Sequence, residues 1–254
     1  MLFVNADDWG RSRAETDAAL ACHARGAVTA VSAMVFMEDS ERAAILANDA
    51  SVDVGLHVNF TQSFSGGNCP ARLAENQERI CRFLKWNKYA LIFYHPLLCE
   101  PFRFVYQAQA DEFLRLYGRT PSHIDGHQHM HLCSNMVIDG IIPCGQKVRR
   151  SFSFQPREKS LLNRVYRRSV DRRLGRRYHL TDYFFSLKQC LLTQRLTRVV
   201  ELARTANVEL MTHPINPYEY DCLMSDLYRG RVAAVPMGSF ARLPAACPRS
   251  CNRV

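Results

Sequence analysis

Four short polar segments, far apart in a chain of 254 residues, carry side chains that bind metal ions or transfer protons. Asp7 and Asp8 end one apolar run, His57 lies within a second, and His213 follows a third. Two adjacent carboxylates at the end of a buried strand repel each other unless a positive group lies beside them. A divalent cation meets that need, because one Asp can bind it while the other accepts a proton from water.

The segment from His123 to His131 reads HIDGHQHMH and carries the strongest signal. Side chains two residues apart share a face in an extended chain, so we expect the four histidines and Asp125 on one side, with a turn near His129. Four imidazoles and a carboxylate on one face are hard to explain as packing. They fit a metal site in which Asp125 orients an imidazole or fixes its tautomer.

Taken singly, the other segments have simple structural explanations: Asp8 could cap a helix, and His57 and His213 could be hydrogen-bonded core residues. His213, fixed by the proline after it, could also donate a proton to a leaving amine, since the usual histidine pKa near roughly 6.5 suits that role. The chain has no serine-nucleophile elbow, Walker loop or dinucleotide-binding glycine motif. The combination therefore indicates water activated by a metal ion.

The elements that must position these residues alternate along the chain. Strands are expected over residues 2–6, 28–36, 52–60, 122–127, 147–152, 183–187 and 208–211, and helices over 13–25, 40–48, 102–117, 157–175 and 191–206. Residues 61–100 are less regular and predict a long loop with a short helix, placed as a lid. The alternation predicts an α/β fold with a mostly parallel sheet, whose active site lies at the carboxyl ends of the strands.

The composition is that of an ordinary globular protein, with 47% hydrophobic and 22% charged residues, and the length allows one domain with a sizeable core. Apolar runs of about 18 residues are absent, so we expect no membrane-spanning helix. The N-terminus does not resemble a signal peptide, and the ten cysteines form no CxxC pair. We therefore expect a cytoplasmic protein with free thiols, Cys247 and Cys251 lying in a C-terminal tail.

The net charge of +9 is concentrated in one stretch. Between Lys147 and Arg177, twelve lysines and arginines stand against Glu158 and Asp171, a local net charge of +10. A solvated basic helix explains this simply; the functional alternative is that residues 157–177 face an anionic membrane surface or an acidic partner. Nucleic acid is not expected, because no nucleic-acid-binding motif accompanies the charge.

The motifs NADDWG, GLHVNFT, PSHIDGHQHMH and MTHP, in this order and spacing, resemble the YdjC-like family of carbohydrate deacetylases. The resemblance covers residues 1–243, taken as a single domain, and excludes the tail at 244–254; Trp9 stands where the family usually has Phe. It implies an irregular (β/α) barrel and hydrolysis of the N-acetyl group of an amino sugar, in an oligosaccharide or a glycolipid. It also implies one divalent metal ion, Mg²⁺ first, with Zn²⁺ or another ion as alternatives.

The resemblance also implies a role for each motif residue. Asp7 is then the base and His213 the acid, and the metal ligands are Asp8, His57 and His127. Arg149 resembles an arginine that the family has near its site, and we expect Asp125 and His129 beside the ligands or the substrate. A homodimer is a further expectation.

Two other functions compete with this one. Alternating His and Asp also serve multinuclear phosphoesterases and amidohydrolase-like enzymes, although these need more ligands than the three named, so one bound ion per chain would favour the deacetylase. A non-catalytic sugar-binding protein is the other alternative. The complete set of five charged and imidazole groups argues against it.

Overall fold

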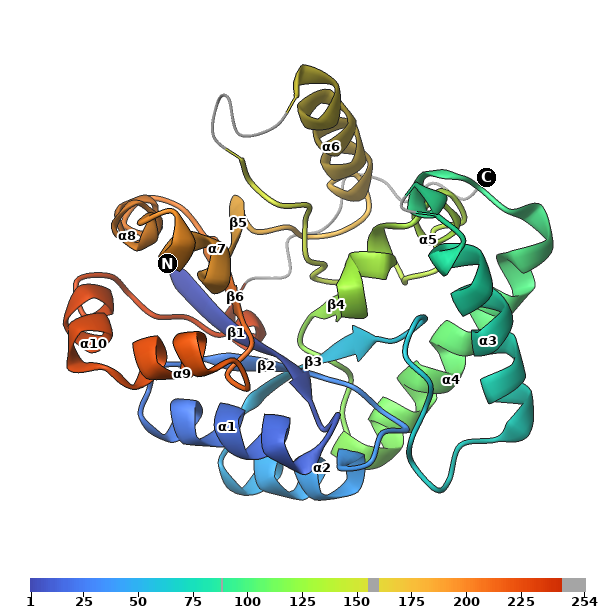
Figure 1. The fold of residues 1–254 in the computed structure, drawn as a ribbon, viewed down its shortest axis with the longest axis horizontal. Helices are drawn as coiled ribbons and strands as arrows, with labels where there is room; N and C mark the ends of the chain where they lie inside the picture. Colours follow the sequence, from blue (N-terminus) through green and yellow to red (C-terminus); the bar gives the residue numbers. More distant parts are fainter. Residues whose placement is uncertain (88, 155–159, 244–254) are drawn as a thin grey trace.

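A computed structural model describes residues 1–87, 89–154 and 160–243. Six strands form one sheet, every pairing between them parallel, in the order β4-β3-β2-β1-β6-β5. They are β1 Leu2–Trp9, β2 Ala30–Ala33, β3 Asp53–Val58, β4 Ile124–Gly126, β5 Tyr183–Ser186 and β6 Val208–Thr212. The sheet curls, and helices cover its outside (Figure 1). The predicted α/β fold with parallel strands is confirmed.

The α-helices are α1 Arg13–Ala24, α2 Ser40–Asp49, α3 Ala71–Lys85, α4 Cys99–Tyr117, α5 Ser134–Ile138, α6 Leu161–Leu174, α7 Leu187–Leu192, α8 Leu196–Ala203, α9 Pro217–Met224 and α10 Asp226–Val232, the last two after β6. The described residues also form the 3-10 helices η1 Ala90–Ile92, η2 Pro96–Leu98, η3 His127–Leu132 and η4 Phe240–Arg242. No helix among the described residues is long and apolar enough to cross a membrane. Among the described residues, Cys22, Cys69, Cys81, Cys99, Cys133, Cys190 and Cys222 are free thiols.

The central strand β1 is buried along its whole length, which explains its near-continuous apolar sequence. Leu2, Val4 and Ala6 belong to the main hydrophobic core. On the other face, Phe3 stacks on Phe240 with 4.9 Å between ring centroids. Asn5 and Asp7 lie on that same inner face, because side chains alternate along a strand. The inside of the curled sheet is therefore apolar at the amino end and polar at the carboxyl end.

Residues 147–153 do not form the strand predicted over 147–152. Val148 makes an isolated bridge with Ile124, and Lys147 makes one with His179. Further along, the Ser153 N–H donates to the carbonyl oxygen of Phe184 at 2.9 Å. The segment thus crosses the gap between β4 and β5, which do not pair with each other in the described sheet. The sheet is an incompletely closed, irregular barrel.

Two helical regions differ from expectation. Residues 61–100 contain the full helix α3 rather than a short one; its buried positions Leu73, Gln77, Ile80 and Leu84 lie on one face. The sequence did not predict the full helix because one buried position is a glutamine, Gln77. The helix also follows Gly66, Gly67 and Pro70, which are typical of loops. The single helix predicted over 191–206 is two helices, α7 and α8, separated at Gln194, whose φ is +54°. The basic helix predicted over 157–175 is α6, which begins at Leu161 after Ser160, whose side chain accepts a hydrogen bond from the Asn163 N–H. Residues 155–159, which include the predicted start of this helix, lie outside the described ranges, as does the tail at 244–254.

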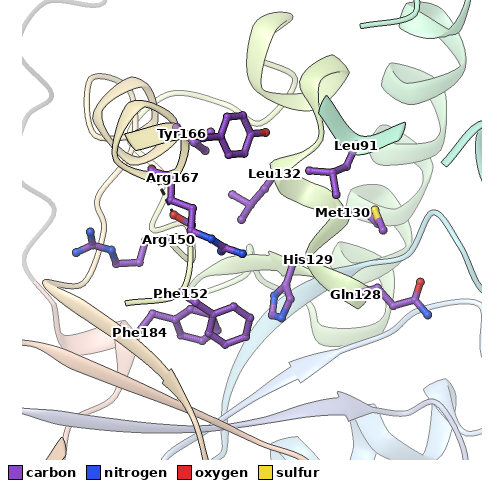
Figure 2. Close-up of a pocket in the computed structure, with 12 residues that line it drawn as sticks. Leu91, Gln128, His129, Met130, Leu132, Arg150, Phe152, Tyr166, Arg167 and Phe184 are labelled. Carbon is purple, nitrogen blue, oxygen red and sulfur yellow. Dashed lines mark hydrogen bonds between the residues drawn. The ribbon is translucent and has the colours of Figure 1, made fainter. Parts of the chain in front are cut away.

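A cavity of about 180 Å³ opens beside α6 at the carboxyl end of the sheet. The Phe152 and Phe184 rings stack at 4.6 Å and form one wall, with His129 against Phe152 (Figure 2). Its other lining residues are Leu91, Gln128, Met130, Leu132, Arg150, Ser151, Tyr166, Arg167 and Val170. Apolar walls with a few polar groups suit a small polar ligand.

The close approach of β3 to His123 gives a test of the fold. A Cβ added at Gly55 would come 2.4 Å from Cε1 of His123, whose ring is buried and stacked on Phe240 at 4.0 Å. Gly55→Ala should lower the free energy of unfolding by about 1–3 kcal/mol, measured by urea denaturation. Gly230→Ala is the control, because nothing lies within 4 Å of that position in α10. It should leave stability unchanged or raise it; equal loss in both variants would contradict the packing described.

Candidate active site and metal centre

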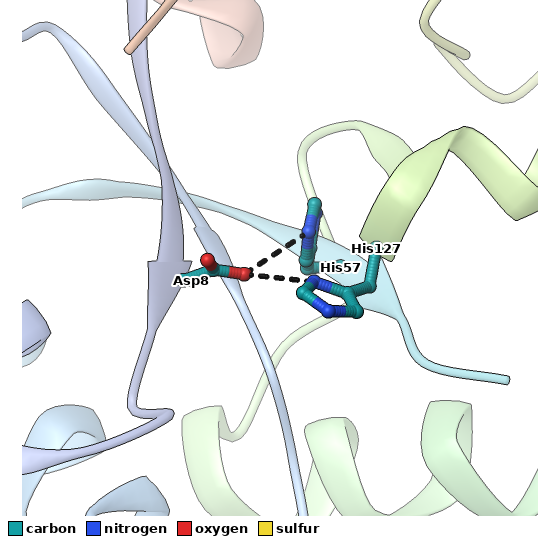
Figure 3. Close-up of side chains that lie close together, drawn as sticks. All are labelled: Asp8, His57 and His127. Carbon is teal, nitrogen blue, oxygen red and sulfur yellow. Dashed lines mark hydrogen bonds and ion pairs between the residues drawn. The ribbon is translucent and has the colours of Figure 1, made fainter. Parts of the chain in front are cut away.

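The polar segments meet at the carboxyl ends of neighbouring strands, as predicted. Asp7 and Asp8 belong to β1, His57 to β3, His127 follows β4 and His213 follows β6. Within this set, Asp8 lies against His57 and His127 (Figure 3). The five residues named from sequence are thus brought to one end of the barrel, and three of them form a compact group.

Asp8 Oδ1 is 3.0 Å from His127 Nδ1 and 3.5 Å from His57 Nε2. The three ligand atoms lie within 4.8 Å of one another, and Asp8 and His57 are buried. One carboxylate oxygen and two imidazole nitrogens can hold a divalent cation and leave positions for water and substrate. This donor set fits Zn²⁺ and other transition metals, whereas Mg²⁺ prefers oxygen ligands. The residues present therefore fit a single metal ion.

Two adjacent aspartates reach the same site because β1 is irregular there. Successive side chains of a regular strand point to opposite faces. The register of β1 on β2 shifts between Ala6 and Trp9, and Asp8 has a φ of +66°. Aspartate adopts this left-handed conformation more readily than most residues. The irregularity brings Asp8 to the inner edge beside Asp7.

Asp8 is a carboxylate at neutral pH. Burial by itself raises its pKa, but the hydrogen bond with His127 and the charges of His57, His127 and His213 hold the pKa well below its usual value. Arg11 Nη1 lies 3.2 Å from the second oxygen of Asp8. The ionised form that a cation requires is thus already favoured.

Asp125 fixes the orientation of His57. The Nδ1 of His57 lies 2.7 Å from Asp125 Oδ1, which leaves Nε2 facing Asp8. A carboxylate behind a ligating imidazole is a common support for metal sites. Burial by itself lowers the pKa of His57, but Asp125, Asp7 and Asp8 raise it to about 9. Cation binding at Nε2 must therefore release a proton from this imidazole.

Arg149 lies behind the metal ligands at 2% exposure. It donates two hydrogen bonds of 2.7 Å to Asp7, and its guanidinium lies 2.6 Å from both Asp125 Oδ2 and Glu209 Oε1. Burial by itself lowers the pKa of Arg149, but these three carboxylates raise it well above the usual value. Asp7, His57 and Asp125 form a second close group, but Arg149 already supplies the positive charge between its two carboxylates. We assign no second ion there.

Asp7 is ionised and firmly held. Burial by itself raises its pKa, but Arg149 outweighs burial and lowers it. Asn5 Nδ2 also donates to Asp7 Oδ1 at 2.9 Å. Both oxygens therefore have protein donors, which fixes the carboxylate plane next to the metal group.

Three residues of this network were not predicted from sequence: Asn5, Ser32 and Glu209. Ser32 Oγ donates to Asp125 Oδ2 at 2.7 Å and accepts from Asn5 at 2.7 Å. Glu209 is 1% exposed, and burial raises its pKa to about 7 despite Arg149. A charged residue within the apolar run VELMT was the available signal for Glu209.

The expected turn near His129 is present, since β4 ends at Gly126 and Gln128 and His129 adopt φ values of +54° and +60°. The prediction that the four histidines and Asp125 share one face is wrong, because the chain is not extended beyond Gly126. His123 is a core residue, with Ser32 and Ser122 hydroxyls at its two ring nitrogens. His131 Nε2 lies 3.0 Å from the carbonyl oxygen of Arg149. Of the four imidazoles, only His127 joins Asp8.

His129 and His213 occupy the two flanks of the site. His129 lines the cavity, and burial lowers its pKa to about 3, so it is neutral. His213 follows β6, next to β1, and its backbone N–H donates to Glu219 Oε2 at 3.0 Å. It is close enough to Asp8 for its charge to contribute to that residue's lowered pKa.

The α/β barrel thus carries an Asp-His-His group that could hold a divalent metal ion, with the Asp7-Arg149 pair beside it. The chain belongs to the family described as YdjC-like protein, whose model matches residues 1–224. It is 34% identical over 133 residues to the chitooligosaccharide deacetylase of Proteus mirabilis, a match that covers 52% of this chain and 50% of that protein. It is 30% identical over 222 residues to the carbohydrate deacetylase of Vibrio vulnificus, covering 84% and 77% of the two chains.

The carbohydrate deacetylase of Homo sapiens is 28% identical over 251 residues, with 85% of this chain and 75% of that protein covered. Among solved structures, one from Enterococcus faecalis, provisionally named a cellobiose-phosphate cleavage protein, superposes with a TM-score of 0.65. That match covers 94% of this chain and 97% of the other at 16% identity, so it supports the fold alone.

Metal binding by the Asp8 group can be measured directly. His127→Ala removes one of three ligands and should weaken binding of Zn²⁺ or Mn²⁺ at least about tenfold, as followed by equilibrium dialysis with metal analysis. His23→Ala is the matched control, because His23 lies in α1 and its ring nitrogen bonds only the carbonyl of Val28. Unchanged stoichiometry and affinity in His127→Ala would rule out the proposed ligand set.

Proposed function

We propose that this protein is a metal-dependent hydrolase that removes the acetyl group from an N-acetylated amino sugar, in an oligosaccharide or a glycolipid. The observation that carries the proposal is the approach of Asp8 Oδ1 to both His57 and His127, beside the separate carboxylate of Asp7. Relatives of this family that are named chitooligosaccharide deacetylase and carbohydrate deacetylase support the substrate class. Mg²⁺ stays the expectation from resemblance, although two imidazole ligands favour Zn²⁺ or another transition metal.

A divalent cation at this site would lower the pKa of a bound water molecule toward neutrality and polarise the acetyl carbonyl group. We assign Asp7 to accept the proton from that water. Arg149 would oppose this step if Asp7 were its only partner. Because Asp125 and Glu209 also bind Arg149, the guanidinium stays compensated when Asp7 becomes neutral.

His213 is assigned to donate a proton to the departing amine. It follows β6 on one side of β1, whereas His57 and His127 come from β3 and β4 on the other side. The assigned acid therefore comes from one side of Asp7 and Asp8, and the two histidine ligands come from the other side. The hydrogen bond from the His213 backbone to Glu219 fixes the start of the turn that carries the imidazole.

The cavity beside α6 is assigned to the sugar. The stacked Phe152 and Phe184 rings offer an apolar surface, and the neutral imidazole of His129 can exchange hydrogen bonds with hydroxyl groups. Phe184 also lies under the guanidinium of Arg149, with Cζ 5.0 Å from the ring centroid. This contact connects the cavity wall to the network that holds Asp7.

A multinuclear phosphoesterase is less well supported, because Arg149 takes the place where a second ion would lie. Of the finer expectations, cytoplasmic location and a homodimer stay predictions. Contact of residues 157–177 with an anionic membrane surface or an acidic partner is likewise a prediction that is independent of the reaction.

Acetate release tests the reaction. The protein, stripped with chelator and reloaded with Zn²⁺, Mn²⁺ or Mg²⁺, should release acetate from N-acetylated glucosamine oligomers or glycolipids, with one ion bound per chain. Chelator should abolish the release and metal should restore it. If no sugar in a broad panel loses acetate in the reloaded protein, the deacetylase proposal fails; two or three ions per chain would favour the phosphoesterase.

Asp7→Asn tests the assigned base. The amide keeps the shape but cannot accept a proton, so kcat should fall at least about 100-fold while metal stoichiometry stays at one. The matched control is Asp17→Asn, since Asp17 lies in α1 and pairs with Arg42 at the surface. Wild-type turnover in Asp7→Asn would remove Asp7 from the role of base.

A further inference from the structure

Two exposed apolar segments adjoin, along the chain, residues that line the cavity. On one side, Trp86, Phe93 and Leu97 are 73%, 54% and 78% exposed. On the other, the first turns of α6 carry Leu161 and Leu162, which are 71% and 82% exposed. Together with Val165, at 53%, these residues are called the apolar rim. Large apolar side chains are rarely gathered in the open on a monomeric protein, and such patches mark interaction surfaces.

The apolar rim is tied to the cavity by residues that line it from both sides. Leu91 of η1 lies on one wall, and Tyr166, Arg167 and Val170 of α6 lie on another (Figure 2). Between the two segments, α5 bonds the first through the His95 N–H, which donates to Asn135 at 3.0 Å. Figure 1 shows α6 projecting from the body of the barrel. The two segments of the rim therefore each carry residues that line the same cavity.

The exposed face of α6 changes from apolar to basic along its length. Leu161 and Val165 are followed on the same face by Arg168 and Arg172, all exposed. Asp171 is the one acid in the described helix, and its carboxylate is already engaged by Arg150 at 2.8 Å and by Ser151. The charge of Asp171 is therefore compensated by Arg150, and the exposed arginines of α6 make the surface next to the leucines positive.

We propose that the apolar rim and the α6 arginines dock this protein on an anionic bilayer surface. Leucine and tryptophan side chains enter the boundary between headgroups and acyl chains, and arginines bind anionic headgroups. A second copy of the chain would bring two stretches of net charge +10 together, which repulsion disfavours. Docking does not depend on the reaction. Only its consequence, that the cavity faces sugars carried by lipids, rests on the proposed function.

The two tryptophans make docking directly visible. Trp9 is fully buried, whereas Trp86 is 73% exposed. Vesicles of equal parts phosphatidylcholine and phosphatidylglycerol should shift the emission of the full protein to the blue and protect it from acrylamide. Trp86→Phe should remove that shift and leave the emission of Trp9. No shift, with no sedimentation of protein with these vesicles, would overturn the proposal.

Variants separate the two parts of the surface. The double variant Leu161→Ser with Leu162→Ser removes two apolar side chains and should weaken binding to the anionic vesicles, measured by sedimentation, at least about tenfold. The double variant Arg168→Gln with Arg172→Gln should also weaken it at least about tenfold, since each arginine contributes roughly fivefold. The controls are Ile45→Ser with Leu227→Ser, on α2 and α10, and Arg229→Gln with Arg231→Gln on α10, all exposed. Added salt should weaken wild-type binding.

Three results would contradict docking on an anionic bilayer: equal loss in the controls, equal binding to pure phosphatidylcholine, or a rim variant that changes only the oligomeric state. Acetate release from soluble sugars separates this proposal from the enzymatic one. Vesicle binding without any acetate release would sink the enzymatic proposal alone. Acetate release without vesicle binding would sink the docking proposal alone.

Discussion

The site depends on one buried guanidinium shared among three carboxylates. Removing Arg149 from water is costly, and that cost is offset only if its donors and charge are fully matched. Asp7, Asp125 and Glu209 provide the match from β1, β4 and β6. Arg149 is carried by the segment that crosses the gap between β4 and β5, and its ion pairs join that segment to the edge strand β4 and to the inner strands β1 and β6. The contacts that hold this segment on the sheet therefore also position Asp7 and Asp125.

Asp125 connects the Arg149 ion cluster to the proposed metal ligand His57. One of its oxygens meets Arg149 and the other meets His57, so the imidazole orientation is coupled to the guanidinium. Asp8, by contrast, forms no ion pair with Arg149 in the part of the chain that the structure describes; its partners are His57, His127 and Arg11. The two adjacent aspartates thus have different partners: Asp7 binds Arg149, and Asp8 lies against two imidazoles. That difference makes Asp8 available to a cation and keeps Asp7 as a separate, fixed carboxylate.

Residue type and strand position were enough to predict the parallel sheet and the location of the polar segments at the carboxyl ends of its strands, whereas the choice of Asp8, His57 and His127 as one group came from the family resemblance. Both can be predicted because apolar runs and strand ends are local properties of a sequence. The distribution of roles within HIDGHQHMH could not be predicted, since it depends on two left-handed residues and on a distant carbonyl group at Arg149. Helix α3 was hidden for a similar reason: Gln77 is buried because it donates to carbonyl groups of Asn59 and Gln62.

The inside of the barrel is arranged in layers whose polarity rises toward the opening. Phe3, Phe240 and His123 stack at the amino end, Asn5 and Ser32 follow, and the Arg149 cluster comes next. Ser32 connects the layers, because its hydroxyl contacts His123 below and Asp125 above. This order explains why His123 is a core residue although it lies in the same run as His127. An imidazole placed two layers below the cation site is held by serine hydroxyls, and its distance from Asp8, rather than its residue type, excludes it from the ligand set.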